Sequence, residues 1–408
     1  MVVVCSSLVE PGSDSYLVTL PSSSRFLPAE ILALILRWDR CEERDAWREM
    51  ANIMLSCSLV SKAWYEAARV VLFKDIRICE VESLRLLLRT VRESFGGHCP
   101  THVLHLSYPW LYLARGSREQ VKEFRTLATE FVACCPELRH MEGHNGILNF
   151  SSDTSLPEYP HLKKLAVSSQ YLHLLAPLLH RARNLMSFEM RRGRSDDKLL
   201  EHCSPPPGFN LSTLTISQPE LSASECKWLF ASSFQSIESL EVEDVGVSLG
   251  YLAEVIGGSV KNLYIRRTVM DFIGSRGIRT MTLSGFTSLR RFRVDEWDPR
   301  WELVGDNLPS SLETLAIPFS MPVVITNVVK LLRSNWQPSL QSLDIWIPLD
   351  VYENPYELRS PLDFLQFSQS MDRWLRDALQ RVCAARGIQP NWLTIPRNDT
   401  SMWVLWIL

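Results

Sequence analysis

Histidine and cysteine are the residues of this 408-residue chain whose types and spacing could do chemistry. The two closest groupings are His98, Cys99, His102 and His105, and then His140 and His144. Imidazole and thiolate groups at short spacing are potential zinc ligands. The first grouping, however, flanks an expected short strand, and Gly143 interrupts the second, which we expect to lie in a loop. We therefore expect no metal site and no cofactor.

Catalytic signatures are missing from the sequence. The ten cysteines are scattered and form no Cys-x-x-Cys spacing, so they are interpreted as reduced thiols packed as small apolar residues. The chain contains no Gly-x-Ser-x-Gly, no glycine-rich phosphate loop with lysine, no Gly-x-Gly-x-x-Gly and no His-Glu-x-x-His. We expect a protein that is not an enzyme.

Charge and hydropathy exclude two further classes of partner. Lys+Arg number 43 and Asp+Glu 46, a net charge of −3 without a basic block, which argues against nucleic-acid binding. The first residues lack the basic start of a signal peptide, and no apolar run approaches the length of a membrane span. We expect an intracellular protein, cytoplasmic, nuclear or both, that does not bind membranes.

The elements that must position any site come from a recurring pattern, apolar-x-x-apolar-x-apolar. Eight copies follow one another at intervals of 23 to 29 residues. They begin at Leu162, Leu185, Leu211, Ile237, Val260, Leu289, Leu312 and Leu340, and two rougher copies begin at Val103 and Leu138. Segments with helical periodicity lie between the copies, so the pattern predicts strands that alternate with helices.

Strand, loop, helix and loop at this period are typical of leucine-rich repeats. We therefore predict an α/β fold in which an irregular leucine-rich-repeat solenoid places a parallel sheet on its concave face and helices on its convex face. The repeats are irregular because the usual Asn or Cys eight residues after the first leucine is absent from all eight copies.

The outward positions of the predicted strands form a candidate target-binding face. Acidic residues, arginines and large aromatics of the kind that anchor protein interfaces lie there. The residues are Glu241, Glu243, Tyr264, Arg266, Arg291, Arg293, Asp295 and Trp346. Two alternatives stay open at this point: Arg266, Arg291 and Arg293 form a basic patch for an acidic or phosphorylated segment, or the row is an ordinary polar surface.

The residues before the repeats have a different character. Leu27-Pro28-Ala29-Glu30-Ile31-Leu32 opens an apolar helix, and Leu59-Val60-Ser61-Lys62-Ala63-Trp64 begins a second apolar stripe that ends at Leu72-Phe73. This pairing resembles the F-box. The link between its two halves, residues 37–52, is a mixed-charge insert that is longer than in compact F-boxes.

The resemblance implies a small helical unit that binds the Skp-type adaptor of Skp–cullin–F-box ubiquitin ligases and, through it, a cullin. It assigns adaptor contacts to Leu27, Pro28, Glu30, Ile31, Leu32, Ile35, Leu59, Val60 and Trp64. A unit so rich in apolar residues is also too small to cover its own apolar surface.

Together these observations predict four segments. Residues 1–24 are a flexible tail, 25–80 the F-box, 81–100 a linking helix and 101–408 the solenoid, which closes with a helical cap. The resulting hypothesis is a non-catalytic substrate receptor that binds the adaptor through its F-box and a target protein through its solenoid. Two alternatives are a scaffold that binds a partner without promoting ubiquitination, and a repeat protein whose N-terminal helices only cap it.

Overall fold

A computed structural model of the chain describes most of its residues from position 59 to position 395. The described ranges are 53, 56–57, 59–108, 118–150, 155–168, 171–191, 205–217, 221–243, 248–267, 279–280, 283–295, 301–302, 308–318, 322–334, 339–348 and 361–395. The chain divides into two compact units, one comprising 1–167 with 177–184 and the other 168–176 with 185–408. The predicted segment boundaries after residues 24, 80 and 100 stay predictions.

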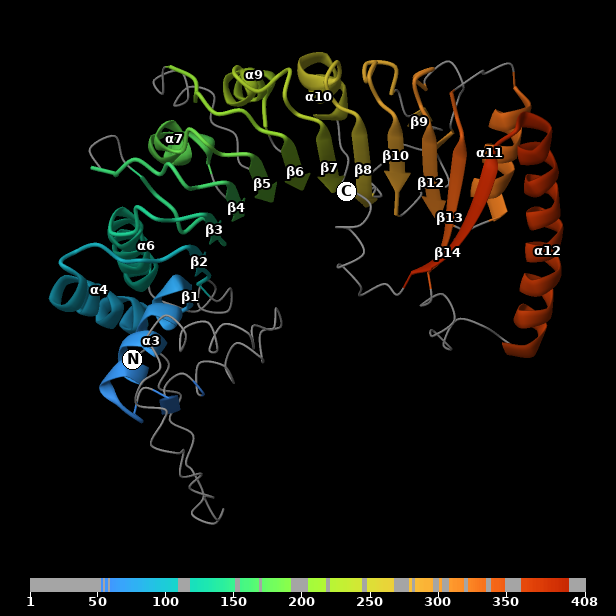
Figure 1. The fold of residues 1–408 in the computed structure, drawn as a ribbon. Helices are drawn as coiled ribbons and strands as arrows, with labels where there is room; N and C mark the ends of the chain where they lie inside the picture. The colour runs from blue at the N-terminus through green and yellow to red at the C-terminus, as the bar shows by residue number, and fades with distance from the viewer. Residues whose placement is uncertain are drawn as a thin grey trace, which may run out of the picture. The chain divides into compact units, whose positions relative to one another are not determined.

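Helices lie between many of the successive strands (Figure 1), whereas β3 and β4, β5 and β6, and β8 to β12 follow one another directly in the order of the described elements. In order they are α3 (Lys62–Lys74), β1 (Asp75–Ile78), α4 (Val81–Phe95), β2 (Val103–Leu106), α6 (Arg118–Ala133), β3 (His140–Gly143), β4 (Lys164–Ser168), α7 (Leu172–Arg181), β5 (Ser187–Arg191), β6 (Thr213–Ser217), α9 (Ala223–Phe230), β7 (Ser239–Glu243), α10 (Ser248–Ile256), β8 (Asn262–Arg267), β9 (Arg279–Thr280), β10 (Arg291–Val294), β11 (Trp301–Glu302), β12 (Thr314–Pro318), α11 (Pro322–Arg333), β13 (Ser342–Pro348), α12 (Pro361–Arg386) and β14 (Gln389–Ile395).

Twelve of the described strands form one open, all-parallel sheet. Its strand order is β1-β2-β3-β4-β5-β6-β7-β8-β10-β12-β13-β14, so it follows the chain order. The predicted α/β class and parallel sheet are confirmed. All eight full copies of the sequence pattern end in strands of this sheet, namely β4 to β8, β10, β12 and β13, and the rougher copy at Leu138 gives β3. The rougher copy at Val103 falls on β2 in the wrong register: Val103 pairs with His140 and is only half-buried, and the buried residues of β2 are Leu104 and Leu106.

The core follows from the two-residue alternation of each strand. In β6, Leu214 and Ile216 are buried while Thr213 and Thr215 stay half-exposed. The same position of β10 is filled by Phe292, which is fully buried. Parallel neighbours in register place these apolar side chains next to one another, so each strand's core is completed only by the adjacent repeats.

Serine hydroxyls join adjacent repeats where the chain enters a strand. Ser236 donates a hydrogen bond of 2.7 Å to the carbonyl of Leu211, and Ser259 one of 2.9 Å to the carbonyl of Ile237. Ser311 donates one of 2.8 Å to the carbonyl of Leu289. Each serine directly precedes the first apolar residue of its own copy and bonds the first apolar residue of the copy before. These hydroxyls satisfy loop carbonyls in repeats that lack the usual Asn or Cys.

The sequence Ser222-x-x-Glu225, ahead of the apolar run at Trp228, predicts a capping box, and helix α9 begins with one. The Glu225 amide donates to Ser222 Oγ at 3.1 Å, and the Ser222 amide donates to Glu225 Oε2 at 3.0 Å. We expect Ser222→Ala to lower the free energy of unfolding by about 1 kcal/mol, because it removes the acceptor for one orphan amide. Urea unfolding of the full chain measures this loss. Glu225→Gln, which keeps an acceptor, should lose less, and an unchanged Ser222→Ala variant would contradict the capping role.

The sequence predicts a long C-terminal helix from about Pro361 to Arg386 that stops at Gly387. Helix α12 has these bounds, and the φ of Gly387 is 69°, which favours glycine. The strand that follows is β14, which pairs with β13 in parallel. A further strand, which the sequence predicts at 403–408, lies outside the described residues. Helix α11 starts at Pro322, whereas the sequence predicts a helix that starts near Thr326.

Candidate functional site

The outward side chains of the sheet lie in straight rows, as the sequence predicts. In the second unit, register aligns one row, which we call the upper row: Glu189, Thr215, Glu241, Tyr264, Arg293, Ala316, Asp344 and Asn391. The lower row lies two residues earlier on each strand and contains Ser187, Thr213, Ser239, Asn262, Arg291, Thr314, Ser342 and Gln389. Because neighbouring parallel strands are about 4.8 Å apart, the side chains of a row are within reach of one another.

Tyr264 occupies the centre of the upper row, and the guanidinium groups of two arginines approach its ring. The guanidinium of Arg293 lies 5.3 Å from the Tyr264 ring centroid, and that of Arg266 lies 5.9 Å from it. Both distances are within the range of cation–π attraction. Tyrosine and arginine in this arrangement are the residue types that anchor protein interfaces.

Several arginines of this face have carboxylate partners. Arg266 forms an ion pair with Glu241, and Arg293 Nε donates a hydrogen bond of 3.1 Å to Asp295 Oδ1. A further pair, Arg191 with Glu189, joins side chains at 2.5 Å. The suggestion of a basic patch at Arg266, Arg291 and Arg293 stays a prediction, and two of these guanidinium groups, those of Arg266 and Arg293, have carboxylate partners on the same sheet. Of the three arginines in that suggestion, Arg291 is the exposed one.

Burial sets the electrostatics of the upper row. Arg293 is 5% exposed, and this burial lowers the pKa of its guanidinium to about 10, although the nearby Asp344 opposes the change. Burial likewise raises the pKa of Glu241, against the effect of Arg266. Buried charges of this kind depend on their partners, so the row is a preorganised polar network.

The end of the row is fixed by β13 and β14. Asn391 Nδ2 donates hydrogen bonds to Asp344 Oδ1 at 2.8 Å and to Ser342 Oγ at 2.9 Å. Ser342 Oγ in turn donates to Asp344 Oδ1 at 2.8 Å.

Two other predicted residues, Glu243 and Trp346, each lie two residues after a member of the upper row. Glu243 ends β7 next to a register shift, and Trp346 is in β13 with its side chain outside the described residues.

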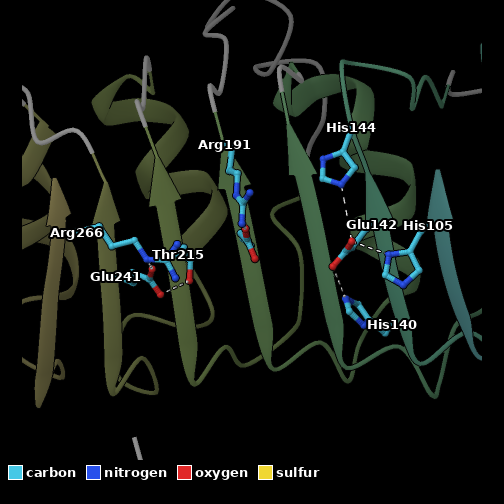
Figure 2. A network of polar contacts seen from close by, with 9 residues as sticks. His105, His140, Glu142, His144, Arg191, Thr215, Glu241 and Arg266 are labelled. Carbon is cyan, nitrogen blue, oxygen red and sulfur yellow. Dashed lines mark hydrogen bonds and ion pairs between the residues drawn. The ribbon is translucent and has the colours of Figure 1, made fainter. Parts of the chain in front are cut away.

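The first unit carries a second polar cluster, which surrounds Glu142 (Figure 2). Glu142 of β3 accepts a hydrogen bond from His105 Nδ1 of β2 at 2.6 Å. The Nε2 atoms of His140 and His144 lie 3.4 Å and 3.8 Å from the same carboxylate. Three imidazoles therefore surround one carboxylate, on side chains that are between one fifth and about one third exposed.

This cluster was missed by the sequence reasoning. His140 was expected in a loop, but it begins strand β3, because the chain there follows the rough repeat copy that starts at Leu138. Extending the outward row by two strands, past Ala166 to Glu142 and then His105, would have found it, since both pairs are in register. Within the described part of the chain, no group of His, Cys, Asp and Glu is arranged to hold a metal ion.

The histidines hold the pKa of Glu142 well below its ordinary value of 4.5, chiefly through the hydrogen bond from His105 and then through His140 and His144. A depressed carboxyl pKa contributes stability above pH 4.5 that is lost as the pH falls toward the folded-state value. We expect Glu142→Gln to lower the free energy of unfolding at neutral pH by about 1–3 kcal/mol.

Urea unfolding of wild type and Glu142→Gln, measured from neutral pH down to about pH 3, tests this linkage. The difference between the two proteins should shrink as the pH falls below the ordinary carboxyl range. A difference that stays constant over the whole series would show that Glu142 does not act through its charge.

The described part of the predicted adaptor surface lies just before and within α3. Leu59 is 88% exposed and Val60 58% exposed in the turn before the helix, and Trp64 is half-buried in its first turn. Ser61 caps the helix by accepting a hydrogen bond from the Trp64 amide. The other six predicted contacts, Leu27, Pro28, Glu30, Ile31, Leu32 and Ile35, and the insert 37–52 lie outside the described residues.

Helix α3 has two different faces. Ala67, Ala68 and Val71 are buried, and Phe73 packs on Phe95 of α4 with ring centroids 4.8 Å apart. Tyr65 and Val70 are exposed on the other side, together with Leu59 and Val60. The helix is therefore anchored to the first repeat while large apolar side chains beside it face solvent.

Comparisons with known proteins give no family for this chain. No family model matches it, and no curated protein matches it. In the described residues, none of the helices has the combined length and hydrophobicity needed to cross a membrane.

Proposed function

We propose that the chain is a non-catalytic substrate receptor of a Skp–cullin–F-box ubiquitin ligase. In this proposal, residues 25–80 are an F-box that binds a Skp-type adaptor, and the repeats, of the leucine-rich kind, bind a target protein. The observation that carries the proposal is the exposure of Leu59 and Val60, two residues to which the F-box resemblance assigns adaptor contacts.

Two features of α3 and of the turn before it support adaptor binding over simple capping. A helix that only capped the repeats would bury its neighbouring apolar side chains against them, whereas Leu59 and Val60 face solvent. The anchoring side of the same helix is already complete, with Ala68 fully buried and Arg69 stacked over Phe95 at 4.0 Å. Large exposed apolar side chains that lie close together are typical of a surface that binds a partner.

The polar face of the sheet supports target recognition. Its side chains are held by ion pairs and hydrogen bonds before any partner arrives, which reduces the ordering cost of binding. Tyr264 and Arg293 supply an aromatic and a guanidinium at its centre. The receptor would then act by position: it holds the target close to the ubiquitin carrier, and other subunits make the bond.

The experiment is co-elution with purified Skp-type adaptor. The full chain, expressed with the adaptor, should elute as a stable complex, and addition of a cullin should shift that complex further. We also expect low solubility of the chain alone and recovery of solubility on co-expression. A chain that is soluble alone and elutes separately from the adaptor would contradict the proposal.

The scaffold alternative is separated by target abundance. If the chain promotes ubiquitination and degradation of its target, proteins bound to the sheet face should accumulate when the proteasome is inhibited. Unchanged abundance of every bound protein, with adaptor binding intact, would instead favour a scaffold.

A further inference from the structure

The cluster around Glu142 has more imidazoles than its carboxylate can neutralise. Three histidine side chains approach the two oxygens of Glu142, and the rings of His105 and His140 have centroids 5.6 Å apart. One carboxylate compensates one positive charge. Protonation of a second and a third imidazole therefore adds uncompensated positive charge within a few ångströms, where the interactions are strong.

Charged groups from both neighbouring strands face this cluster. On β1, Arg77 is in register with His105, and Asp75 lies two residues earlier on the same face. On β4, Lys164 is in register with His140. With neutral histidines, the two basic and two acidic groups of this face cancel. With all three histidines protonated, the same face carries three net positive charges.

One nitrogen atom of the face is buried without an acceptor. Among the described residues, Arg77 Nε has no hydrogen-bond partner, whereas His140 Nε2 lies 3.4 Å from Glu142 Oε1. A buried donor that lacks an acceptor costs free energy, and a ligand that supplies an acceptor removes that cost. Carboxylate oxygens accept strong, charge-assisted hydrogen bonds from imidazolium and guanidinium groups.

We propose that this face, which we call the histidine face, docks an acidic segment of the target protein and does so more tightly as the pH falls. It comprises Asp75, Arg77, His105, His140, Glu142, His144 and Lys164. The inference rests on the proposed function, because it names the chemistry of the target. Histidine is the side chain whose charge ordinarily changes between pH 5 and 8. Glu142 stays ionised throughout that range, since its pKa is held far below it.

The test uses the full chain and a fluorescent peptide of about ten glutamates as the acidic probe. Fluorescence anisotropy at constant ionic strength gives its affinity at about pH 7.5 and about pH 5.5, on either side of the ordinary histidine range. We expect binding to be about tenfold tighter at the lower pH, because added positive charge on the face attracts the glutamates.

Matched variants distinguish a pH effect of the histidine face from one caused by protonation elsewhere on the chain. His105→Gln with His140→Gln should reduce the pH effect to less than about threefold. The control, His98→Gln with His161→Gln, removes two exposed histidines elsewhere and should keep the full effect. Near-UV circular dichroism at both pH values checks that each variant is folded. His144→Lys, which carries a permanent charge, should tighten binding at the higher pH.

Equal affinity at both pH values, or equal loss of the pH effect in test and control variants, would overturn the inference. Adaptor co-elution, measured at both pH values, keeps the two proposals apart. Loss of the pH effect with adaptor binding intact would contradict only the histidine face. Absence of adaptor binding with the pH effect intact would contradict only the receptor function.

Discussion

Replacing Leu59 and Val60 by aspartate is expected to weaken adaptor binding by at least about 100-fold, because two exposed apolar contacts are lost and each, at the centre of an interface, is worth about 1.4 kcal/mol or more, which is tenfold in affinity. Both side chains face solvent in the chain alone, so the substitutions leave its own packing intact. Isothermal titration calorimetry with purified adaptor measures the affinity, and thermal unfolding checks that stability is retained.

The matched control for this prediction is Leu86→Asp. Leu86 lies on α4, is 42% exposed, and is outside the predicted F-box. Adaptor affinity should be unchanged in this variant. If Leu86→Asp weakened binding as much as the double variant, the effect would come from added negative charge. If the double variant bound the adaptor normally, Leu59 and Val60 would not be contacts.

The second large effect concerns the repeat core. Phe292→Ala should lower the free energy of unfolding by about 3–5 kcal/mol, since it opens a cavity at a fully buried position between β8 and β12. Equilibrium urea unfolding measures the loss. Arg291→Ala, one residue earlier on the outward face, should change stability by no more than about 0.5 kcal/mol. Equal losses at both positions would contradict the alternation on which the sheet is built.

The strands were predictable because their signal is periodic. A position such as Leu214 must be apolar in every repeat, since it packs against the equivalent residues of both neighbours, so the same spacing recurs along the chain. That periodicity also fixed the outward rows and the register of Glu241 with Tyr264. The capping box of Ser222 and Glu225 was predictable for another reason: the motif is local, because both partners lie within one helical turn.

Ion pairs within the site were less predictable, because the position of a residue in a row does not determine which acidic and basic side chains pair. The register shift after Val242 aligns Glu243 with Arg267 and displaces Arg266 from the ladder, and Arg266 then pairs with Glu241. No residue type in the sequence announces that shift. The histidine face was missed because its strand β3 follows a rough copy of the pattern, with Gly143 at the last apolar position.

The measurement that tests the central claim most directly is hydrogen–deuterium exchange of the full chain with and without bound adaptor. Amide exchange reports local opening, so a docked segment gains protection. We predict new protection confined to residues 25–80, which include the turn at Leu59 and Val60, and unchanged exchange in strands β5 to β8. Protection over the sheet strands, or none in residues 25–80, would contradict the assignment of the adaptor to the N-terminal segment and of the target to the sheet.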